Sequence, residues 1–236
     1  MPQLDAFRIS AKDLGSLAMP DCCERCFWIH RHYKIPFQIF PGIFSSIDSY
    51  TKKVVHGYFE KYKKAPDWMA PLGKIKNYVE PPSRKEFRVF DDSSGVTLTG
   101  VPDEVLVRMD GTYMIIDYKT ARYTEKQDEM LPVYDIQLNG YAYIAERCGL
   151  KPVVGLALVY TEPRTEEHDA MDEGNRTVDG FKMPFGIKVV SVDLKPDKVL
   201  PLMKKTRTIY DNKQPPKGRD GCKDCDCLAK LVEIQS

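Results

Sequence analysis

The chain has 236 residues, of which 42% are hydrophobic and 29% charged, and its formal net charge is +1. This composition is ordinary for a globular protein with a buried core, and it argues against a strongly basic protein that coats nucleic acid through its global charge. No apolar run is long enough to span a bilayer, and Met1–Ser10 lacks a basic segment followed by an apolar one, so we expect an intracellular protein.

The first third of the chain is predicted to be mainly helical. A helix over Ser10–Arg31, with Ser10 as its N-cap, is interrupted near Pro20, and a loop over Phe37–Gly42 separates it from a second helix over Ser45–Lys63. Ala65–Pro82 is rich in proline and is predicted to be irregular. The second helix is predicted from an apolar stripe that consists of Ile47, Tyr50, Val54, Tyr58 and Tyr62.

The middle of the chain changes to the alternating pattern of strands. Three antiparallel strands are predicted over Glu86–Phe90, Val96–Met109 and Thr112–Lys119. Turns at Asp91–Gly95 and Asp110–Gly111 join them.

A helix and further strands follow. The helix is predicted over Asp135–Leu150, and the nearly continuous apolar run Val153–Tyr160 is typical of a strand buried on both faces. Because a helical crossover joins this strand to Thr112–Lys119, the two are expected to pair in parallel. The acidic segment Glu162–Gly180 is expected to be a mobile insertion. A later strand and helix are predicted over Gly186–Leu194 and Asp197–Tyr210.

Two carboxylates and a lysine are predicted to meet at the end of the third strand. Asp117 and Lys119 are two residues apart, so both side chains face one side of the sheet. If Gly111 takes the left-handed position of a three-residue loop, Asp103 lies opposite Asp117. A two-residue turn would instead place Glu104 there, so Glu104 is the alternative. Two carboxylates about 5 Å apart repel each other unless a cation lies between them.

This combination suits phosphodiester hydrolysis. A bound cation neutralises the phosphate and activates a water molecule, and a nearby lysine can orient that water and stabilise developing charge. The alternative is that Asp103 and Asp117 are ordinary turn and strand-end residues and that Lys119 is a solvated strand tip.

Three segments in this order resemble the motifs of PD-(D/E)XK nucleases of the RecB-like branch: Gly100–Asp103, Ile115–Thr120 and Gln137–Tyr141. The resemblance implies a restriction-endonuclease-like α/β fold, in which helices flank a mixed sheet, and a nuclease that uses Mg²⁺ or Mn²⁺ on DNA. It further implies that Asp103 and Asp117 are catalytic metal ligands, that the backbone carbonyl of Tyr118 is another ligand, and that Lys119 is the catalytic lysine.

The resemblance also gives roles to residues on the two flanking helices. Gln137 and Tyr141 match a family motif, lie on one helix face and are expected to contact DNA or support Lys119. The alternative is that this face packs on the sheet, with Tyr141 in the core. His56 is at a position where RecB-like nucleases carry a metal-binding histidine, although a lone histidine on a helix is more often a packed or solvated residue. A histidine ligand would favour Mn²⁺ over Mg²⁺.

The chain contains seven cysteines, which in a reducing compartment favour metal ligands or buried thiols over disulfides. Cys23 and Cys26 form one CxxC pair, and Cys222 and Cys225 form another near the opposite end. Neither pair alone completes a tetrahedral site, so both are predicted to bind one centre and join the ends of the chain. Cys148, inside a predicted helix, is expected to lie in the core.

The identity of this centre is open. Some RecB-like nucleases, including CRISPR-associated ones, hold an iron–sulfur cluster with one N-terminal and three C-terminal cysteines. One scheme therefore places Cys23, Cys222, Cys225 and Cys227 around [4Fe–4S]; another places the two CxxC pairs around zinc. Unliganded thiols are the third reading, and Cys22 is an additional thiol beside the first pair.

Together these observations predict a nuclease domain over residues 1–210, with its core motifs within 50–160. A cysteine-rich tail over 211–236 is expected to pack with residues 20–30. We expect a metal-dependent DNA exonuclease that acts in repair, recombination or the processing of mobile-element or CRISPR-type DNA. The alternatives are a catalytically silent nucleic-acid-binding module of the same fold and a zinc-stapled scaffold protein.

Overall fold

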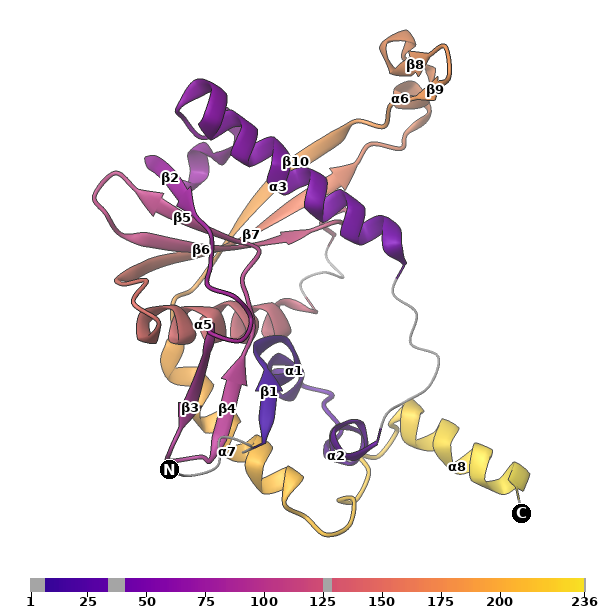
Figure 1. Cartoon of the computed structure of the whole chain (residues 1–236). Coiled ribbons are helices and arrows are strands. Elements are labelled where there is room, and N and C mark those ends of the chain that lie inside the picture. Colours follow the sequence, from indigo (N-terminus) through magenta and orange to yellow (C-terminus); the bar gives the residue numbers. More distant parts are fainter. Residues whose placement is uncertain (1–6, 34–40, 125–128, 236) are drawn as a thin grey trace.

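A five-stranded mixed sheet lies at the centre of the computed structural model, which describes residues 7–33, 41–124 and 129–235 (Figure 1). The strand order is β10-β7-β6-β5-β2, in which β6 and β7 are parallel and the other neighbours antiparallel. The parallel pairing confirms the predicted helical crossover. The bounds of these strands are β2 Ile75–Val79, β5 Glu104–Arg108, β6 Tyr113–Lys119, β7 Val153–Pro163 and β10 Phe185–Val192.

Helices α3 (Gly42–Tyr62) and α5 (Leu131–Arg147) cover opposite faces of this sheet (Figure 1). Alternate residues of β6 face opposite sides, so Ile116 packs with α3 in one core, whereas Ile115 packs with α5 in the other. Asp117 shares the α5 side, where it contacts Gln137. The predicted α/β fold with a mixed sheet between helices is therefore confirmed.

The buried face of α3 differs from the predicted stripe. Its buried residues are Thr51, Val55 and Phe59, whereas Tyr50 and Tyr62 are 68% and 52% exposed. Tyrosine rings can lie along an apolar surface while their hydroxyls stay in water, so they mark the rim of a buried face as often as its centre. Burial of Val55 and Phe59 contributes roughly 1.5–3 kcal/mol each.

The predicted strand Val96–Met109 is in fact two strands that belong to different sheets. Strand β4 (Val96–Thr99) joins a small sheet of order β1-β4-β3, with β1 at Arg8–Ser10 and β3 at Arg88–Asp91. The break begins at Gly100, whose φ of +153° is rarely adopted by residues with a side chain. Apolar and polar residues alternate on both sides of the break, so the sequence pattern alone did not reveal that the strand is divided.

Several elements lie where irregular chain was predicted. Residues 65–82 contain the 3₁₀ helix η2 (Asp67–Leu72) and the edge strand β2, whose exposed Lys76 and Asn77 weaken the alternating pattern. The expected mobile insertion contains short elements, and the cysteine-rich tail contains helix α8. Their bounds are α6 Glu167–Met171, η3 Glu173–Asn175, β8 Arg176–Thr177, β9 Gly180–Phe181 and α8 Lys223–Gln235. The loop predicted up to Gly42 lies mostly outside the described residues, and Gly42 itself begins α3.

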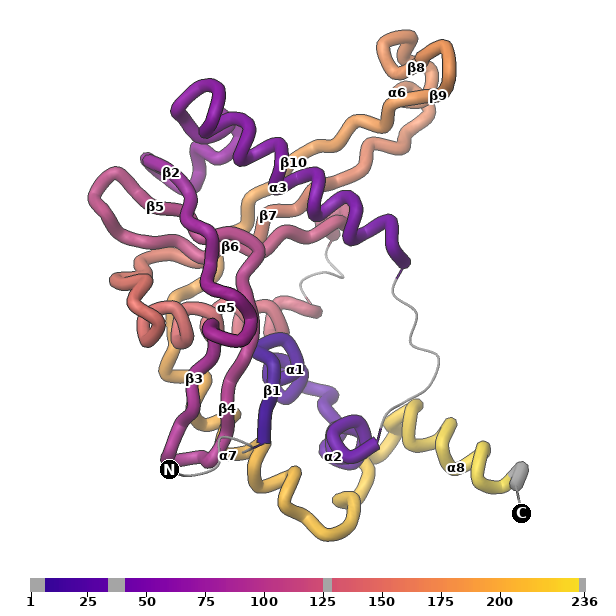
Figure 2. The backbone as a smooth tube through the Cα atoms, viewed as in Figure 1, coloured from indigo at the N-terminus to yellow at the C-terminus, as the bar shows by residue number. Residues whose placement is uncertain are grey.

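The N-terminal helices lie beside the C-terminal ones (Figure 2). Ser10 caps α1 as predicted, because its Oγ accepts a hydrogen bond of 3.0 Å from the Asp13 backbone N–H. Trp28 Nε1 donates to the carbonyl of Asn212 at 2.9 Å. The bounds here are α1 Ala11–Gly15, η1 Ser16–Ala18, α2 Glu24–His32, η4 Pro196–Lys198 and α7 Val199–Tyr210.

Within the described part of the chain, no helix combines the length and the apolar character that crossing a membrane requires.

Candidate functional site

Strands β5 and β6 pair in the register predicted from a three-residue loop. Glu104 pairs with Ile116, and the same register continued by one residue places Asp103 opposite Asp117. Gly111 in the turn has a φ of +83°, in the left-handed region where glycine is favoured. The pairing is therefore confirmed, while the metal-binding role of either carboxylate stays a prediction.

Asp103 lies at the start of β5, between a backbone donor and a lysine. Its Oδ2 accepts a hydrogen bond of 2.9 Å from the Tyr118 backbone N–H. Its Oδ1 is 3.3 Å from Nζ of Lys52, which reaches across from α3. These two contacts fix the carboxylate beside the end of β6 while leaving 29% of the side chain exposed.

Asp117 is a buried carboxylate, 4% exposed. Its Oδ1 accepts a hydrogen bond of 3.0 Å from Gln137 Nε2, and its Oδ2 pairs with the ammonium of Lys119. Burial raises the pKa of Asp117 to about 6; the Lys119 charge lowers this pKa, and the Asp103 charge raises it. Lys119 Nζ also lies 4.4 Å from the centre of the Tyr134 ring on α5. The site thus contains an acid whose charged form is costly even beside the Lys119 ammonium.

Gln137 and Tyr141 lie one turn apart on α5 and support the carboxylate. Gln137 Nε2 donates to both Asp117 and the Tyr141 hydroxyl, the latter at 2.9 Å. Both side chains are buried, and burial raises the pKa of Tyr141 further above its ordinary value. Gly100 makes room for the ring, because a Cβ at this position would lie 2.5 Å from Tyr141 Cε1. The absence of a side chain at Gly100, in the first motif, therefore leaves the space that the ring of Tyr141, in the third motif, occupies.

The structure places His56 against Glu104 and not against the Asp103–Asp117 pair. His56 Nε2 is 2.8 Å from Glu104 Oε2, and its ring stacks on Tyr78 with a centroid separation of 3.7 Å. Glu104 is only 1% exposed; burial raises its pKa, and the His56 charge partly offsets this effect. Glu104, considered only as an alternative ligand, is thus the partner of the predicted histidine ligand.

The carboxylate pair has the chemistry to hold a hard divalent cation. Asp103 and Asp117 offer oxygen ligands, which Mg²⁺ and Mn²⁺ prefer. Among the described residues at this site, Gln137 Oε1 is a buried acceptor atom that receives no hydrogen bond, while Asp117 Oδ2 is paired with the Lys119 ammonium. A buried acceptor without a donor is destabilising unless an ion or water reaches it. The residues present therefore fit such an ion.

Sequence reasoning missed two polar groups at this end of the sheet. Lys52 precedes His56 by four residues, so the helical spacing alone would have placed both on one face of α3. Thr120 Oγ1 donates to Asp48 Oδ1 on α3 at 2.8 Å, which ties the helix to the end of β6. No local pattern marks this contact, because the two residues are 72 positions apart.

The two CxxC pairs come together at the ends of the chain. The Sγ of Cys23 is 3.6 Å from that of Cys225, and the Sγ of Cys26 is 3.6 Å from that of Cys222 and 3.5 Å from that of Cys225. Searched over the described ranges, this is the one group of three or more His, Cys, Asp or Glu whose ligand atoms all lie within 4.8 Å of one another. The four cysteines could therefore bind a metal ion.

Backbone donors favour a thiolate in this group. The Arg219 backbone N–H donates to Cys23 Sγ at 3.4 Å. Burial raises the pKa of Cys23, but the backbone N–H groups of Arg219 and Cys26 and the neighbouring thiols lower it to about 6. Thiolates are the forms that bind metals.

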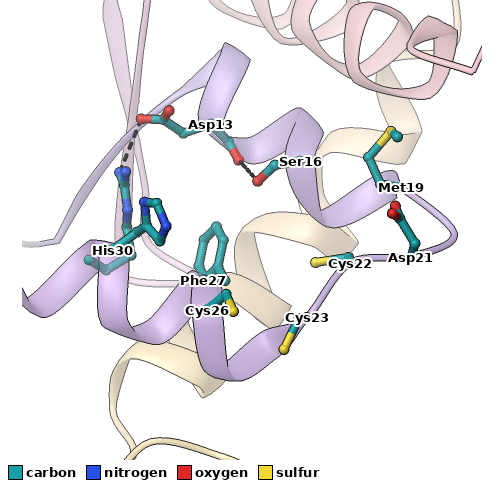
Figure 3. Close-up of a pocket in the computed structure, with 10 residues that line it drawn as sticks. Asp13, Ser16, Met19, Asp21, Cys22, Cys23, Cys26, Phe27 and His30 are labelled. Carbon is teal, nitrogen blue, oxygen red and sulfur yellow. Dashed lines mark hydrogen bonds and ion pairs between the residues drawn. The ribbon is translucent and has the colours of Figure 1, made fainter. Parts of the chain in front are cut away.

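The remaining cysteines lie outside this group. Figure 3 shows Cys22 and Cys23 with their sulfur atoms pointing in different directions, and Cys22 lines a pocket of about 330 Å³ together with Asp13 and Met19. Cys227 is exposed. Cys148 is half-buried at the edge of the core, with its Sγ 3.7 Å from the carbonyl of Glu86.

Comparison with known proteins gives one family. A family model of the PD-(D/E)XK nuclease superfamily matches residues 48–229, a range that contains the carboxylates, the lysine and the second CxxC pair. No curated protein matches. Among solved structures, the crystal structure of SSO0001 is similar, with 12% identity and a TM-score of 0.44 over 96% of this chain and 84% of that chain.

Proposed function

We propose a function for this chain, which belongs to the PD-(D/E)XK nuclease superfamily. It is a metal-dependent exonuclease that hydrolyses phosphodiester bonds in DNA. Membership supports a nuclease-type function and hence a nucleic-acid substrate. The observation that carries the proposal is the buried Asp117 carboxylate, held beside Asp103 and Lys119 at the end of the sheet. The finer assignments, exonuclease and a role in DNA repair or recombination, rest on the resemblance of the three motifs to RecB-like nucleases.

Each residue of the site has a part in this chemistry. Asp103 and Asp117 would hold Mg²⁺ or Mn²⁺, which supplies Lewis-acid stabilisation of the phosphate and a water of lowered pKa. Lys119 would then donate to the attacking water or to a phosphate oxygen, where charge develops. Gln137 fixes Asp117 by its hydrogen bond and places its own unpaired Oε1 next to the site. A silent binding module would not require this full set.

The test is cleavage of end-labelled DNA with and without Mn²⁺. Wild-type protein should shorten the labelled strand only with the metal, and a circular strand should resist if the activity is exonucleolytic. Lys119→Ala should lose activity by roughly 100-fold or more while still binding DNA. Lys64→Ala is the matched control, because Lys64 is exposed and pairs only with Asp67 among the described residues. Wild-type cleavage by Lys119→Ala would remove the proposed role of this lysine.

We also propose that the four cysteines hold one zinc ion. A tetrahedral site with Zn–S bonds of roughly 2.3 Å has sulfur atoms about 3.8 Å apart, close to the 3.5–3.6 Å that separates three of the sulfur pairs here, with all four sulfurs within 4.8 Å of one another. A [4Fe–4S] cluster needs space for four irons and four sulfides, so its cysteine sulfurs must lie farther apart than in a single-ion site. The group formed by the two CxxC pairs favours the single ion.

Metal analysis distinguishes these centres. Protein purified without oxygen should contain about one zinc per chain and no iron, and it should be colourless. Brown protein with iron would contradict the zinc assignment and favour the iron–sulfur scheme. Absence of both metals would leave the four cysteines as thiols.

A further inference from the structure

The ammonium of Lys119 has two partners, which come from different elements. Its Nζ pairs with Asp117 Oδ2 on the same strand, and it lies 4.4 Å from the centre of the Tyr134 ring on α5. The Lys119 side chain is only 17% exposed, so little water solvates this charge. An ammonium over an aromatic ring is attracted by the negative face of the ring, and this attraction grows as water is excluded. The ring is therefore a second partner of the lysine.

Tyr134 belongs to the face of α5 that already supports Asp117. Tyr134, Gln137 and Tyr141 are three and four residues apart, so they form one stripe along the helix. Gln137 donates to Asp117 and to the Tyr141 hydroxyl. Tyr134 lies one turn nearer the start of the helix, where it contacts Lys119. One stripe of α5 thus contacts both charged groups of β6.

Close packing fixes the backbone next to Tyr134. The first turn of α5 lies so near α1 that a Cβ at Gly15 would be 2.4 Å from the carbonyl oxygen of Val133. Val133 directly precedes Tyr134 and is buried. Tyr134 itself is half-buried and packs against the core on this side of the sheet. The position of the ring therefore follows from the packing of α5 and does not depend on the lysine.

We propose that Tyr134 is a positioning residue of the nuclease site, whose ring face keeps the Lys119 ammonium at the end of β6 while Asp117 serves as a metal ligand. The inference rests on the proposed nuclease function and adds a residue to its machinery. The ring acts on the reaction through Lys119, whose ammonium has the proposed role of donating to the attacking water or to a phosphate oxygen.

The ion pair with Asp117 is not sufficient for this task. The carboxylate oxygens that attract Lys119 are also the oxygens that a divalent cation would engage, so Asp117 cannot serve as a ligand and remain the sole partner of the lysine. A lysine has a flexible four-carbon stem, and its ammonium leaves a position that only one weakened contact defines. A neutral ring holds the ammonium without competing with Asp117 for the cation, as another carboxylate would.

The kinetics of DNA cleavage at saturating Mn²⁺ test the ring. Tyr134→Leu should lower kcat about 5- to 30-fold, which corresponds to roughly 1–2 kcal/mol, and should leave KM for DNA unchanged. Tyr134→Phe should keep the wild-type kcat, because the ring face remains. Pentafluorophenylalanine at position 134 keeps the shape of the ring but removes its negative face, so it should lower kcat as leucine does.

Tyr143→Leu is the matched control for the loss of a tyrosine from α5. Tyr143 also has a cation over its ring, with Cζ of Arg147 3.5 Å from the ring centre. It lies nine residues after Tyr134, which is two and a half helical turns, and so faces the opposite side of the helix. Its replacement should leave kcat and KM at their wild-type values.

A second measurement does not depend on cleavage. In protein that contains ¹³C-labelled lysine and is kept in a chelator, the ε-CH₂ signal of Lys119 is identified by its absence from Lys119→Ala. The ring current of Tyr134 should move this proton signal upfield of that of an exposed lysine such as Lys64. The upfield shift should disappear in Tyr134→Leu and persist in Tyr134→Phe.

Several outcomes would overturn the proposal. Wild-type kcat in Tyr134→Leu or in the pentafluorophenylalanine variant would show that the ring face has no part in the reaction. An equal loss in Tyr134→Phe would assign the effect to the hydroxyl, and a raised KM with unchanged kcat would make Tyr134 a DNA contact. If wild type cleaves no DNA with Mn²⁺, the nuclease function fails, whereas the ring-current shift still decides whether Tyr134 holds Lys119.

Discussion

Replacing Asp117 by Asn should stabilise the metal-free protein, although it should abolish cleavage. The carboxylate is 4% exposed and lies beside Asp103. Asparagine keeps the shape of the protonated acid and still accepts a hydrogen bond from Gln137, but it carries no charge. The variant therefore removes the cost of a buried charge that the Lys119 ammonium offsets only in part.

The magnitude follows from the pKa of this group. Burial raises it from an ordinary value of 3.8 to about 6, and at roughly 1.4 kcal/mol for each pKa unit this difference corresponds to about 3 kcal/mol. Between these two pH values the folded state binds the proton more readily than the unfolded state. Stability therefore falls as pH rises through this window, and the full penalty is present above about pH 6.

The assay is urea unfolding in the presence of a chelator at pH 7.5 and pH 5. Asp117→Asn should gain up to about 3 kcal/mol over wild type at pH 7.5 and clearly less at pH 5. Added Mn²⁺ should stabilise wild type and leave the variant unchanged. Asp92→Asn, at an exposed turn residue, is the control. A variant that is no more stable than wild type at pH 7.5, or whose advantage is the same at both pH values, would refute this reasoning.

Three further predictions test other parts of the structure. Gly100→Ala should destabilise the fold by about 1–3 kcal/mol, because its Cβ would clash with Tyr141; Gly57→Ala, which meets open space within α3, should instead stabilise it by up to about 1 kcal/mol in the same urea titration. His56→Ala should raise the Mn²⁺ concentration for half-maximal cleavage by roughly tenfold or more, and an unchanged metal titration would limit His56 to its pairing with Glu104. Cys225→Ser should lose bound zinc and lower the thermal midpoint, whereas Cys227→Ser should retain both; equal losses would place Cys227 in the centre.

Local patterns predicted the elements that carry the candidate site. The apolar run of β7 and the helical period of α5 together imply a crossover, and a crossover of this kind leads to parallel strands. The turn at Gly111 then set the hairpin register, since a one-residue shift would have moved every side chain of β5 to the other face. The parallel pairing and the hairpin register were both predicted correctly, because each follows from the residue pattern within single elements or turns.

Features that depend on distant packing escaped prediction. Strand β1 is three residues long and pairs with β4, nearly ninety positions away, so no periodicity can develop. Helix α8 is mostly exposed, and its Cys225 lies against the N-terminal cysteines. The pairing of His56 with Glu104 likewise requires that α3 and β5 be brought together first, which neither sequence neighbourhood reveals.

The break at Gly100 connects the fold to the proposed chemistry. An unbroken strand from β4 into β5 would keep both in one sheet and would leave no bend before Asp103. The positive φ at Gly100 ends β4 in the small sheet, and the absence of a Cβ allows Tyr141 to pack against the bend. Tyr141 in turn meets Gln137, which donates to Asp117. One glycine therefore permits both the change of sheet and the close packing of Tyr141, whose partner Gln137 holds the Asp117 carboxylate.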